Sequence, residues 1–375
     1  MAKLLPCAAV SLLLALLSSS EPVASSSVRV RRYDSIFSFG DSFADTGNNP
    51  VVFRRCSVSD AATRPPYGST FFGRPTGRNC DGRLIIDFLA ERLGLPLVPP
   101  FLAHNGSFRR GANFAVGAAT ALDAGVFHHG EPPGASQFPL NTSLDVQLQW
   151  FESLKPSLCA TAKECKQFFR TSLFFVGEFG FNDYSFLLLR KSIQQVRSIV
   201  PDVIRTISMA IERLIKHGAT SLVVPGMYPF GCSPLFLVKS DDGDPARYDS
   251  RAGCLNDMNE LATRHNSLLL ESLEKIRAEH PGVEVTYADF FSPVKEMVES
   301  PSKFGPKSSR KVTELGVAGF EGDVLTVCCG GPGRYHCNVE VLVQRSSCDH
   351  MQGSICSFVL GWHPLDGGGI PIRRR

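Results

Sequence analysis

The sequence lacks an excess of charge of either sign. Its 39 lysines and arginines nearly balance 36 aspartates and glutamates, which leaves a net charge of +3 at pH 7. Proteins that bind nucleic acid or an anionic membrane surface through charge carry a basic excess or a long run of like charges. The sequence has neither feature, so we expect neither partner.

Long hydrophobic runs are also lacking, with one exception near the N-terminus. Lys3 precedes an apolar stretch over residues 4–17, and small and polar residues follow over 18–27. This order is typical of a secretory signal peptide, and the apolar stretch is shorter than a membrane-spanning helix needs. We therefore expect residues 1–27 to be a signal peptide and the mature protein to be secreted and soluble, without a membrane span.

Cysteine is well represented, with twelve residues in the chain, of which eleven remain once Cys7 leaves with the signal peptide. In an oxidising compartment most cysteines form disulfides, and the odd number leaves one thiol over. Short separations make Cys159 with Cys165, and Cys232 with Cys254, reasonable pairs. The cysteines between 328 and 356 do not repeat the CxxC spacing of a zinc site, so we expect no metal.

Two sequons for N-linked glycosylation fit the same compartment. They begin at Asn105 and Asn141, in Asn-Gly-Ser and Asn-Thr-Ser. Such acceptors lie on the surface of secreted proteins, so we expect glycans at both.

Internal repeats and long low-complexity segments are absent, and the pattern indicates one α/β domain. Short apolar runs alternate with long amphipathic stretches, which predicts a parallel sheet with right-handed crossovers. The Pro- and Gly-rich stretches 65–83 and 130–141 are expected to be surface loops, the first near the functional site. The predicted strands are 35–39, 173–177, 221–224 and 283–287, and the predicted helices are 84–93, 203–217 and 255–279.

Polar residues follow the first two of these strands. Ligands of an open parallel sheet bind at the carboxyl ends of its strands. Ser42 stands there after the first strand, where it is either a nucleophile or a helix cap. Asn182 follows the second, where its amide either donates to an oxyanion or stabilises a turn. Gly117 lies among small residues, which either bring a backbone N–H close to a substrate or pack a helix on the sheet.

These segments together resemble the plant GDSL-type esterase/lipase family of the SGNH hydrolase superfamily, nearest to its sinapine esterase-like branch. The resemblance extends from about Tyr33 to about Cys356, and several independent blocks occur in the family's order. The main blocks are residues 37–48, 113–117 and 176–184, and supporting blocks are 81–88, 224–234, 287–290 and 328–330.

The resemblance implies a flavodoxin-like three-layer α/β/α SGNH hydrolase fold and hydrolysis of carboxylic esters through an acyl-serine intermediate. It assigns the nucleophile to Ser42 and the oxyanion hole to the N–H groups of Ser42 and Gly117 and the side chain of Asn182. Related sequences often carry a second glycine where this chain has Ala118. The expected substrates are small acylated metabolites or lipids, no cofactor is expected, and the expected location is extracellular, in the cell wall or apoplast.

The family's last block is missing from this sequence. That block places an aspartate three residues before the histidine that accepts the serine proton. After Cys356 the only histidine is His363, with Leu360 three residues before it. His363 with Asp366 as partner is a weak substitute in a Gly-rich tail, so no general base is identified.

The change after Cys356 is abrupt, and the family's C-terminal helix is missing as well. We therefore expect the hydrolase domain to cover residues 28–357 and residues 358–375 to form a divergent, poorly ordered tail. The pattern fits an alternative or incorrectly predicted last exon. The alternative to an active esterase is a catalytically impaired isoform or a non-catalytic ligand-binding member of the family. The sequence does not indicate an oligomeric state.

Overall fold

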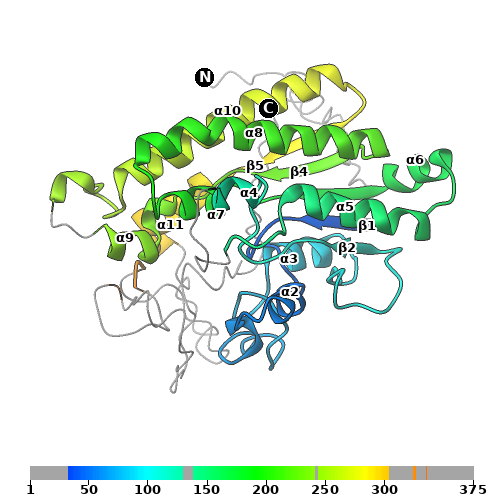
Figure 1. The fold of residues 1–375 in the computed structure, drawn as a ribbon, viewed down its shortest axis with the longest axis horizontal. Helices are drawn as coiled ribbons and strands as arrows, with labels where there is room; N and C mark the ends of the chain where they lie inside the picture. Colours follow the sequence, from blue (N-terminus) through cyan, green and yellow to red (C-terminus); the bar gives the residue numbers. More distant parts are fainter. Residues whose placement is uncertain (1–32, 130–137, 241–243, 304–323, 327–334, 336–375) are drawn as a thin grey trace, which may run out of the picture. The chain divides into compact units, whose positions relative to one another are not determined.

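The central feature of the fold is a parallel sheet of five strands in the order β2-β1-β3-β4-β5 (Figure 1). The computed structural model describes residues 33–129, 138–240, 244–303, 324–326 and 335, to which every structural statement below refers. Ser35 to Phe39 pair in register with Ser172 to Val176. The strands are β1 Ser35–Phe39, β2 Gly111–Asn113, β3 Ser172–Val176, β4 Ser221–Pro225 and β5 Glu284–Ala288.

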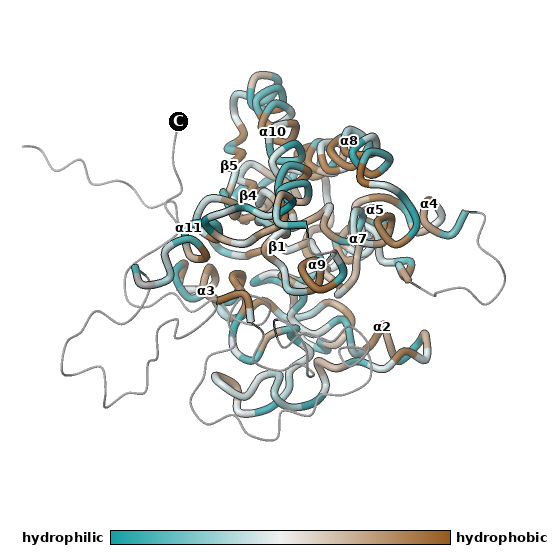
Figure 2. Tube along the Cα trace, turned by 90° about the vertical axis from the view of Figure 1, so that its left-hand side faces the viewer, coloured by the Kyte–Doolittle hydropathy of each residue, from teal (hydrophilic) through white to brown (hydrophobic). Residues whose placement is uncertain are grey.

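Helices flank the sheet on both faces, which makes the predicted three-layer α/β fold (Figure 2). Right-handed crossovers require this arrangement, because the chain leaves β1 in one direction for β2 and then returns across the sheet to β3, β4 and β5. One face carries α5 Leu144–Leu154, α6 Ala162–Arg170, α8 Ile193–His217 and α10 Asn256–Glu279, and the other carries α3 Ile85–Arg92 and α11 Phe291–Glu299.

Phenylalanine dominates the core between the sheet and its first helices. Phe37 of β1 is fully buried, and its ring lies 5.7 Å from Phe151 of α5 and 5.5 Å from Phe169 of α6. Phe174 of β3 stacks on Phe37 at 5.5 Å. Rings at these separations add about 0.5–1.5 kcal/mol per pair beyond the burial of their area. Strands β1 and β3 are therefore packed firmly against helices α5 and α6.

The four predicted strands and three predicted helices are confirmed, and most bounds agree within one residue. Helix α8 is the exception, because it begins ten residues before the predicted start. Ser192 caps it, accepting a hydrogen bond from the N–H of Gln195 at 3.4 Å, and the helix continues through Pro201 to Gly218. A proline inside a helix usually marks its start or a break, which is why the sequence pattern predicted a later beginning.

Several short elements were not predicted. Strand β2 has only three residues, two of them Gly111 and Asn113, and shows no apolar run. The unpredicted helices are α2 Asn49–Arg55, α4 Gly125–His128, α7 Phe181–Leu187 and α9 Pro234–Lys239, together with α5, α6 and α11. Most are shorter than the window in which a helical period becomes visible.

The loop 65–83 has no strand or α-helix, as predicted, and it lies against the segment that follows β1. Its Arg78 forms a buried pair with Asp87 of α3 at 2.8 Å and also donates to the carbonyl oxygen of Thr46 at 3.2 Å. The loop is therefore anchored next to the candidate site. The other predicted loop, 130–141, lies partly outside the described residues.

Both predicted disulfides are present, Cys159–Cys165 and Cys232–Cys254. Cys56 and Cys80 are free thiols in the described part of the chain. The signal peptide, the cysteines after 327 and the C-terminal tail lie outside that part. No described helix is both long enough and apolar enough to cross a membrane.

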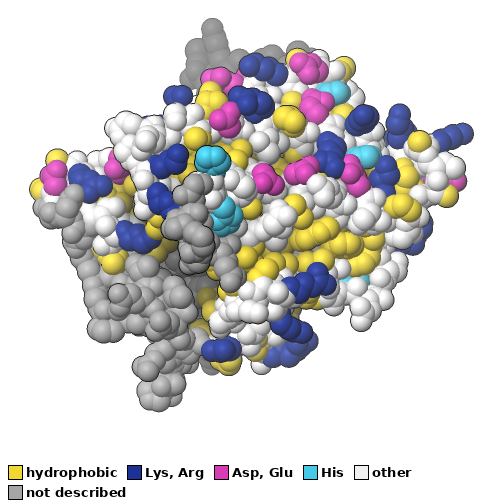
Figure 3. Space-filling view, in the orientation of Figure 1, with side chains coloured by type: hydrophobic (Ala, Val, Ile, Leu, Met, Phe, Trp, Pro, Cys, Tyr) yellow, Lys and Arg dark blue, Asp and Glu magenta, His cyan; other side chains and the backbone are white. Residues whose placement is uncertain are grey.

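Acidic and basic side chains interleave on the outer face of α8 and α10 (Figure 3). Arg213 of α8 pairs with Asp145 and Glu152, and His280 pairs with Glu212. This face therefore carries mixed charge.

The turn after β1 requires a glycine. Gly40 has φ +151°, and a Cβ there would lie 2.6 Å from the carbonyl oxygen of Gly177 in the turn after β3. We expect Gly40→Ala to lower the free energy of unfolding by more than about 3 kcal/mol, since the neighbouring backbone must move. Gly94→Ala is the matched control, because Gly94 has φ +67° with nothing within 4 Å and should cost about 1 kcal/mol. Equal losses in urea unfolding would contradict the close approach.

Candidate active site

The turn that carries Ser42 is held from both sides. It follows β1 directly, and the N–H of Gly40 donates to Gln147 Oε1 of α5 at 2.9 Å. The side-chain amide of Gln147 donates back to the carbonyl oxygen of Gly40 at 2.8 Å. Ser42 itself is partly exposed, and its hydroxyl makes no hydrogen bond with any residue in the described ranges. The serine is thus presented on a fixed turn with a free side chain.

Asp41 links this turn to the end of β3. Its Oδ1 accepts the N–H of Phe43 at 2.9 Å, and its Oδ2 accepts the side-chain amide of Asn182 at 2.9 Å. The amide nitrogen of Asn182 also donates to the carbonyl oxygen of Ala119 at 3.0 Å. The structure therefore brings together the segments of Ser42, Asn182 and Gly117, all three of which the sequence predicted for the site.

The segment after β2 lies directly beside the serine turn. The N–H of Val116 donates to the carbonyl oxygen of Gly40 at 3.2 Å. The N–H of Gly117 is engaged, since it donates to Asp45 Oδ2 at 3.1 Å. Ala118 is partly exposed and has φ +66°, a left-handed conformation that is uncommon for a residue with a side chain.

Two backbone N–H groups remain without an acceptor at this point. Within the described residues, neither the N–H of Ser42 nor that of Ala118 donates a hydrogen bond. Their two segments are in direct contact through Val116 and Gly40. Both N–H groups are therefore available to an acceptor from outside the described residues. The sequence suggested the N–H of Gly117 as an oxyanion donor, and in the structure that N–H donates to Asp45.

Asp45 and Asp183 hold the loops around this position, a role that the sequence did not reveal. Asp45 accepts the N–H groups of Gly47, Asn48 and Asn49 at 2.7–2.9 Å, in addition to that of Gly117. Asp183 accepts the N–H groups of two residues just after the Ala118 segment, Ala121 and Leu122, both at 2.9 Å. An Asp that follows a strand end and precedes turn residues is the only sequence signal for such anchoring.

Four carboxyl groups are buried in the segments around Ser42, those of Asp41, Asp45, Asp183 and Glu178. Burial raises the pKa of Asp41 and of Asp45 to about 7, and that of Asp183 to about 6. Burial also raises the pKa of Glu178 well above its usual range, with a further contribution from the charge of Asp41. No lysine or arginine among the described residues forms an ion pair with any of the four.

Glu178 differs from the three aspartates, because only the backbone N–H of Phe181 acts on its carboxyl group, outside the geometry of a formed hydrogen bond. It follows Gly177 at the end of β3, is fully buried, and has no described partner for either oxygen. A carboxylate in that setting is costly, which is why burial raises the pKa of Glu178.

No described histidine is placed as a general base for Ser42. His265 is buried and its Nδ1 lies 2.8 Å from the hydroxyl of Tyr184, and burial lowers its pKa to about 3. His217 and His280 contact glutamates, and His128 contacts the carbonyl oxygen of Pro139. His363, the one histidine of the tail, lies outside the described residues, so the base remains without a structural position.

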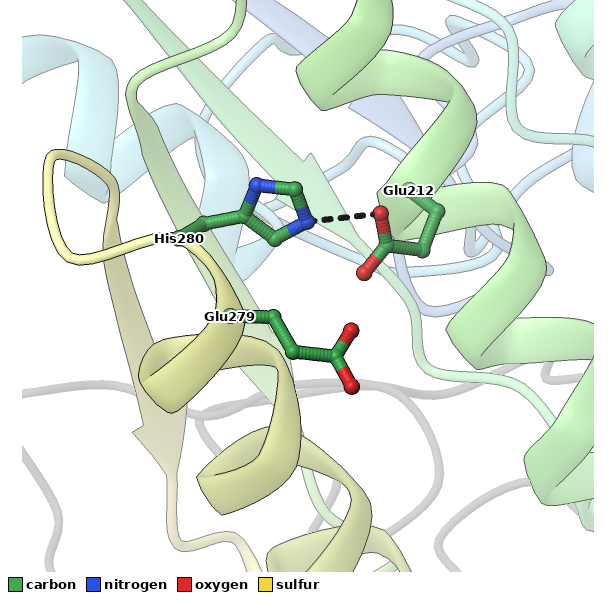
Figure 4. A group of neighbouring side chains, drawn as sticks. All are labelled: Glu212, Glu279 and His280. Atoms are coloured by element: carbon green, nitrogen blue, oxygen red, sulfur yellow. Dashed lines mark hydrogen bonds and ion pairs between the residues drawn. The ribbon is translucent and has the colours of Figure 1, made fainter.

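One group of side chains in the described ranges has the composition of a metal site (Figure 4). Glu212, Glu279 and His280 place one ligand atom each within 4.8 Å of one another. His280 Nε2 lies 2.8 Å from Glu212 Oε2, and an ion pair between the two side chains explains this contact. Glu279 ends α10, which leads into the amino end of β5, so the group lies at the sheet edge opposite to that of Ser42. It has no part in the candidate active site.

Both glycosylation sequons begin at accessible side chains. Asn105 and Asn141 are exposed, Asn105 before β2 and Asn141 just before α5. Glycosylation of the two asparagines remains a prediction.

Comparison with known proteins identifies the family of this chain. The family model for the GDSL-like lipase/acylhydrolase matches residues 36–338. A GDSL esterase/lipase of Arabidopsis thaliana is 45% identical over 313 residues, which cover 81% of this chain and 79% of that protein. Sinapine esterase of Brassica napus is 40% identical over 369 residues, covering 93% and 92% of the two chains.

The left-handed backbone at Ala118 leads to a prediction about stability. Ala118→Gly is expected to raise the free energy of unfolding by about 1 kcal/mol, because glycine adopts φ +66° without the clash of a Cβ. The neighbouring Ala119→Gly serves as control and should lose about 1 kcal/mol, since Ala119 is buried and does not have a positive φ. A loss of stability in both variants in urea unfolding would contradict this account of Ala118.

The neutral state of Glu178 can be tested through pH. The unfolded chain releases this proton above about pH 4, whereas the folded chain retains it, so wild-type stability falls as the pH rises toward the folded pKa. Glu178→Gln cannot ionise, so its free energy of unfolding should rise relative to that of the wild type as the pH rises above about 4, by up to about 1.4 kcal/mol per pH unit, until the pH reaches the folded pKa of Glu178.

Glu152→Gln is the control of opposite sign for that experiment. A hydrogen bond from Arg213 lowers the pKa of Glu152 to about 2, so this substitution should destabilise the protein at every pH above about 4. A Glu178→Gln difference from wild type that is independent of pH would show that Glu178 is ionised in the folded protein.

Proposed function

The chain belongs to the GDSL-like lipase/acylhydrolase family, and on that basis we propose that it hydrolyses carboxylic esters through an acyl intermediate on Ser42. Carboxylic ester hydrolysis is the activity of the family. The observation that carries the assignment to Ser42 is its free hydroxyl on a fixed turn beside two unoccupied backbone N–H groups.

In the first step the hydroxyl oxygen of Ser42 attacks the ester carbonyl carbon, and the carbonyl oxygen gains negative charge. The N–H groups of Ser42 and Ala118 supply donors for that oxygen, and we assign the donor of this segment to Ala118 in place of Gly117. The amide of Asn182 becomes a third donor when one hydrogen turns from the carbonyl oxygen of Ala119 to the substrate. The alcohol then leaves, and water hydrolyses the acyl-serine.

Asp41 acts in this scheme through Asn182 and Phe43. Its two oxygens accept from both, so it sets the spacing between the serine turn and the amide donor. Both contacts use Asp41 as an acceptor, which favours its ionised form, while the neutral Glu178 avoids placing a second charge beside it.

The proton of Ser42 needs an acceptor, and the described residues supply none. Loss of a triad member costs about 10⁴- to 10⁶-fold in turnover, whereas an oxyanion hole retains about 10³-fold over water. We therefore propose weak ester hydrolysis for this chain unless a histidine of the C-terminal segment, such as His363, reaches Ser42. The alternative, a non-catalytic member that binds an acylated ligand, has the same site residues and no turnover.

The proposed substrates are small acylated metabolites or lipids. The likeness to a protein named sinapine esterase supports the first group. The proposed location is extracellular, in the cell wall or apoplast, which the signal-like N-terminus, the sequons and the two disulfides support.

Hydrolysis of a short p-nitrophenyl ester by the full chain tests the role of Ser42. Where a histidine of the C-terminal segment serves as the base, we expect Ser42→Ala to lower the rate by at least about 100-fold toward the uncatalysed rate, because it removes the attacking oxygen. Without a base the loss is smaller, because the serine and its base act as a unit. Ser198→Ala is the control, since Ser198 lies on the exposed face of α8 and should leave the rate unchanged. Equal rates for wild type and Ser42→Ala would support the non-catalytic alternative.

A further inference from the structure

The segment between β1 and β2 differs in charge from the rest of the chain. Residues 46–110 contain nine arginines and no lysine, against three aspartates and one glutamate. The glutamate, Glu91, is paired with Arg83 at 2.9 Å. The aspartates are all buried, namely Asp60, Asp81 and Asp87. The surface of this segment therefore carries arginine without a balancing carboxylate outside that one pair.

Four of these arginines are exposed on one folded part of the segment. Two end helix α2, one follows the short 3-10 turn after it, and one lies in the loop 65–83; they are Arg54, Arg55, Arg64 and Arg74. None of the four forms an ion pair with a described residue. We call these four side chains the arginine patch.

Backbone contacts hold the parts that carry the arginine patch together. Gly68 follows Arg64 by four residues, and a Cβ on Gly68 would clash with the carbonyl oxygen of Arg74, so the turn 68–74 is closed at its ends. The loop then returns to the start of α2, since a Cβ on Gly77 would lie 2.8 Å from Pro50 Cγ. The four arginines therefore belong to one compact region of the surface.

An exposed aromatic ring lies at the tip of the turn 68–74. Phe71 is 51% exposed, and the guanidinium of Arg83 stacks on its ring at 4.3 Å. The same guanidinium stacks on Phe88 of α3 at 4.1 Å, so Phe71 rests on a fixed support. The ring thus offers a supported apolar surface within three residues of Arg74.

The space-filling view shows the same separation of charge. On the face in Figure 3, the part below the sheet, which is blue to cyan in Figure 1, shows Lys and Arg side chains without Asp or Glu. The outer face of α8 and α10 carries both signs instead, as in the pair of His280 with Glu212. A surface region of one sign attracts a polymer of the opposite sign, even when the net charge of the whole chain is small.

The composition of the arginine patch favours a polymer of carboxylates. Each member is an arginine, whose planar guanidinium can donate two parallel hydrogen bonds to one carboxylate. The ring of Phe71 adds an apolar surface on which the C–H groups of a sugar ring can rest. The choice of partner also rests on the proposed extracellular location, which places the chain beside polysaccharides rather than nucleic acid.

We propose that the arginine patch, together with Phe71, binds an acidic polysaccharide, a chain of uronic acid units. Its carboxylates pair with the arginines, and a sugar face lies on the ring of Phe71. Arg78 of the same loop donates to the carbonyl oxygen of Thr46, four residues after Ser42, so the patch and the serine turn belong to one anchored unit. The binding does not use Ser42 and does not depend on ester hydrolysis.

Binding of the full chain to polygalacturonate, measured by affinity electrophoresis, tests the charges. The combined variant Arg54→Gln, Arg55→Gln, Arg64→Gln and Arg74→Gln should bind at least about tenfold more weakly, because each lost ion pair reduces the affinity a few-fold. Wild-type binding should also weaken at least about tenfold between about 0.05 M and about 0.3 M salt. Binding that is unchanged in the variant, or insensitive to salt, would overturn the proposal.

A matched control separates the arginine patch from net charge. The combined variant with glutamine at four exposed lysines of α6, α8 and α10 removes the same number of positive charges elsewhere, at Lys163, Lys166, Lys216 and Lys275. Its affinity should change less than about twofold, and an equal loss in both variants would overturn the assignment to the patch. Two double variants, of Arg54 with Arg55 and of Arg64 with Arg74, give the same test if the fourfold variant does not fold.

The class of polymer is tested with a second set of probes. Poly-glutamate carries carboxylates without sugar rings, so Phe71→Ala should weaken binding of polygalacturonate at least about threefold and that of poly-glutamate less than about twofold. Tighter binding of phosphatidylserine vesicles or duplex DNA than of polygalacturonate would overturn the proposal and assign the patch to that partner. Ser42→Ala should bind polygalacturonate like the wild type, so a failure of the proposed esterase function leaves this inference standing.

Discussion

The hydrogen bond between the carboxylate of Asp41 and the amide of Asn182 is the contact on which the candidate site depends. The two side chains come from the carboxyl ends of β1 and β3, which are neighbours in the sheet, so the bond fixes the distance between the turn of Ser42 and the side chain of Asn182. The same amide reaches Ala119 and thereby adds the segment after β2. Three loops that are far apart in the sequence are thus oriented by one side-chain pair on a rigid sheet.

This arrangement carries an electrostatic cost that ordinary packing would avoid. Asp41, Asp45, Asp183 and Glu178 are buried without a described cation, and formed hydrogen bonds from backbone N–H groups offset part of the cost for the three aspartates. Functional sites often retain such unfavourable groups, while the rest of the fold supplies the stability they consume. The phenylalanine core around Phe37 and the buried pair of Arg78 with Asp87 provide that support here.

The sequence predicted the main strands and long helices well, because apolar runs and amphipathic periods report directly on burial. It also placed Ser42 and Asn182 after strands of one parallel sheet, and the hydrogen bond of Asn182 with Asp41 joins those two segments. It did not predict β2, whose three residues form a strand only because β1 lies beside them. It did not predict the hydrogen bond from the N–H of Gly117 to Asp45, because no local pattern reports which acceptor a backbone N–H finds across 72 residues. Glu178 likewise could be recognised as a buried neutral acid only from its surroundings.

The brevity of β2 has a consequence for the behaviour of the protein in concentrated solution. β2 is the outer strand on its side of the sheet, and an outer strand offers unpaired backbone groups to which a second molecule can add. Here the strand has only three residues, all of them buried, and its last residue is paired on the outer side, because Asn113 exchanges hydrogen bonds with Pro99 and Phe101 at 2.9 and 2.8 Å. Strand addition between copies at this edge therefore has almost no template, which protects the chain from aggregation through the same short strand that brings Ala118 to the serine.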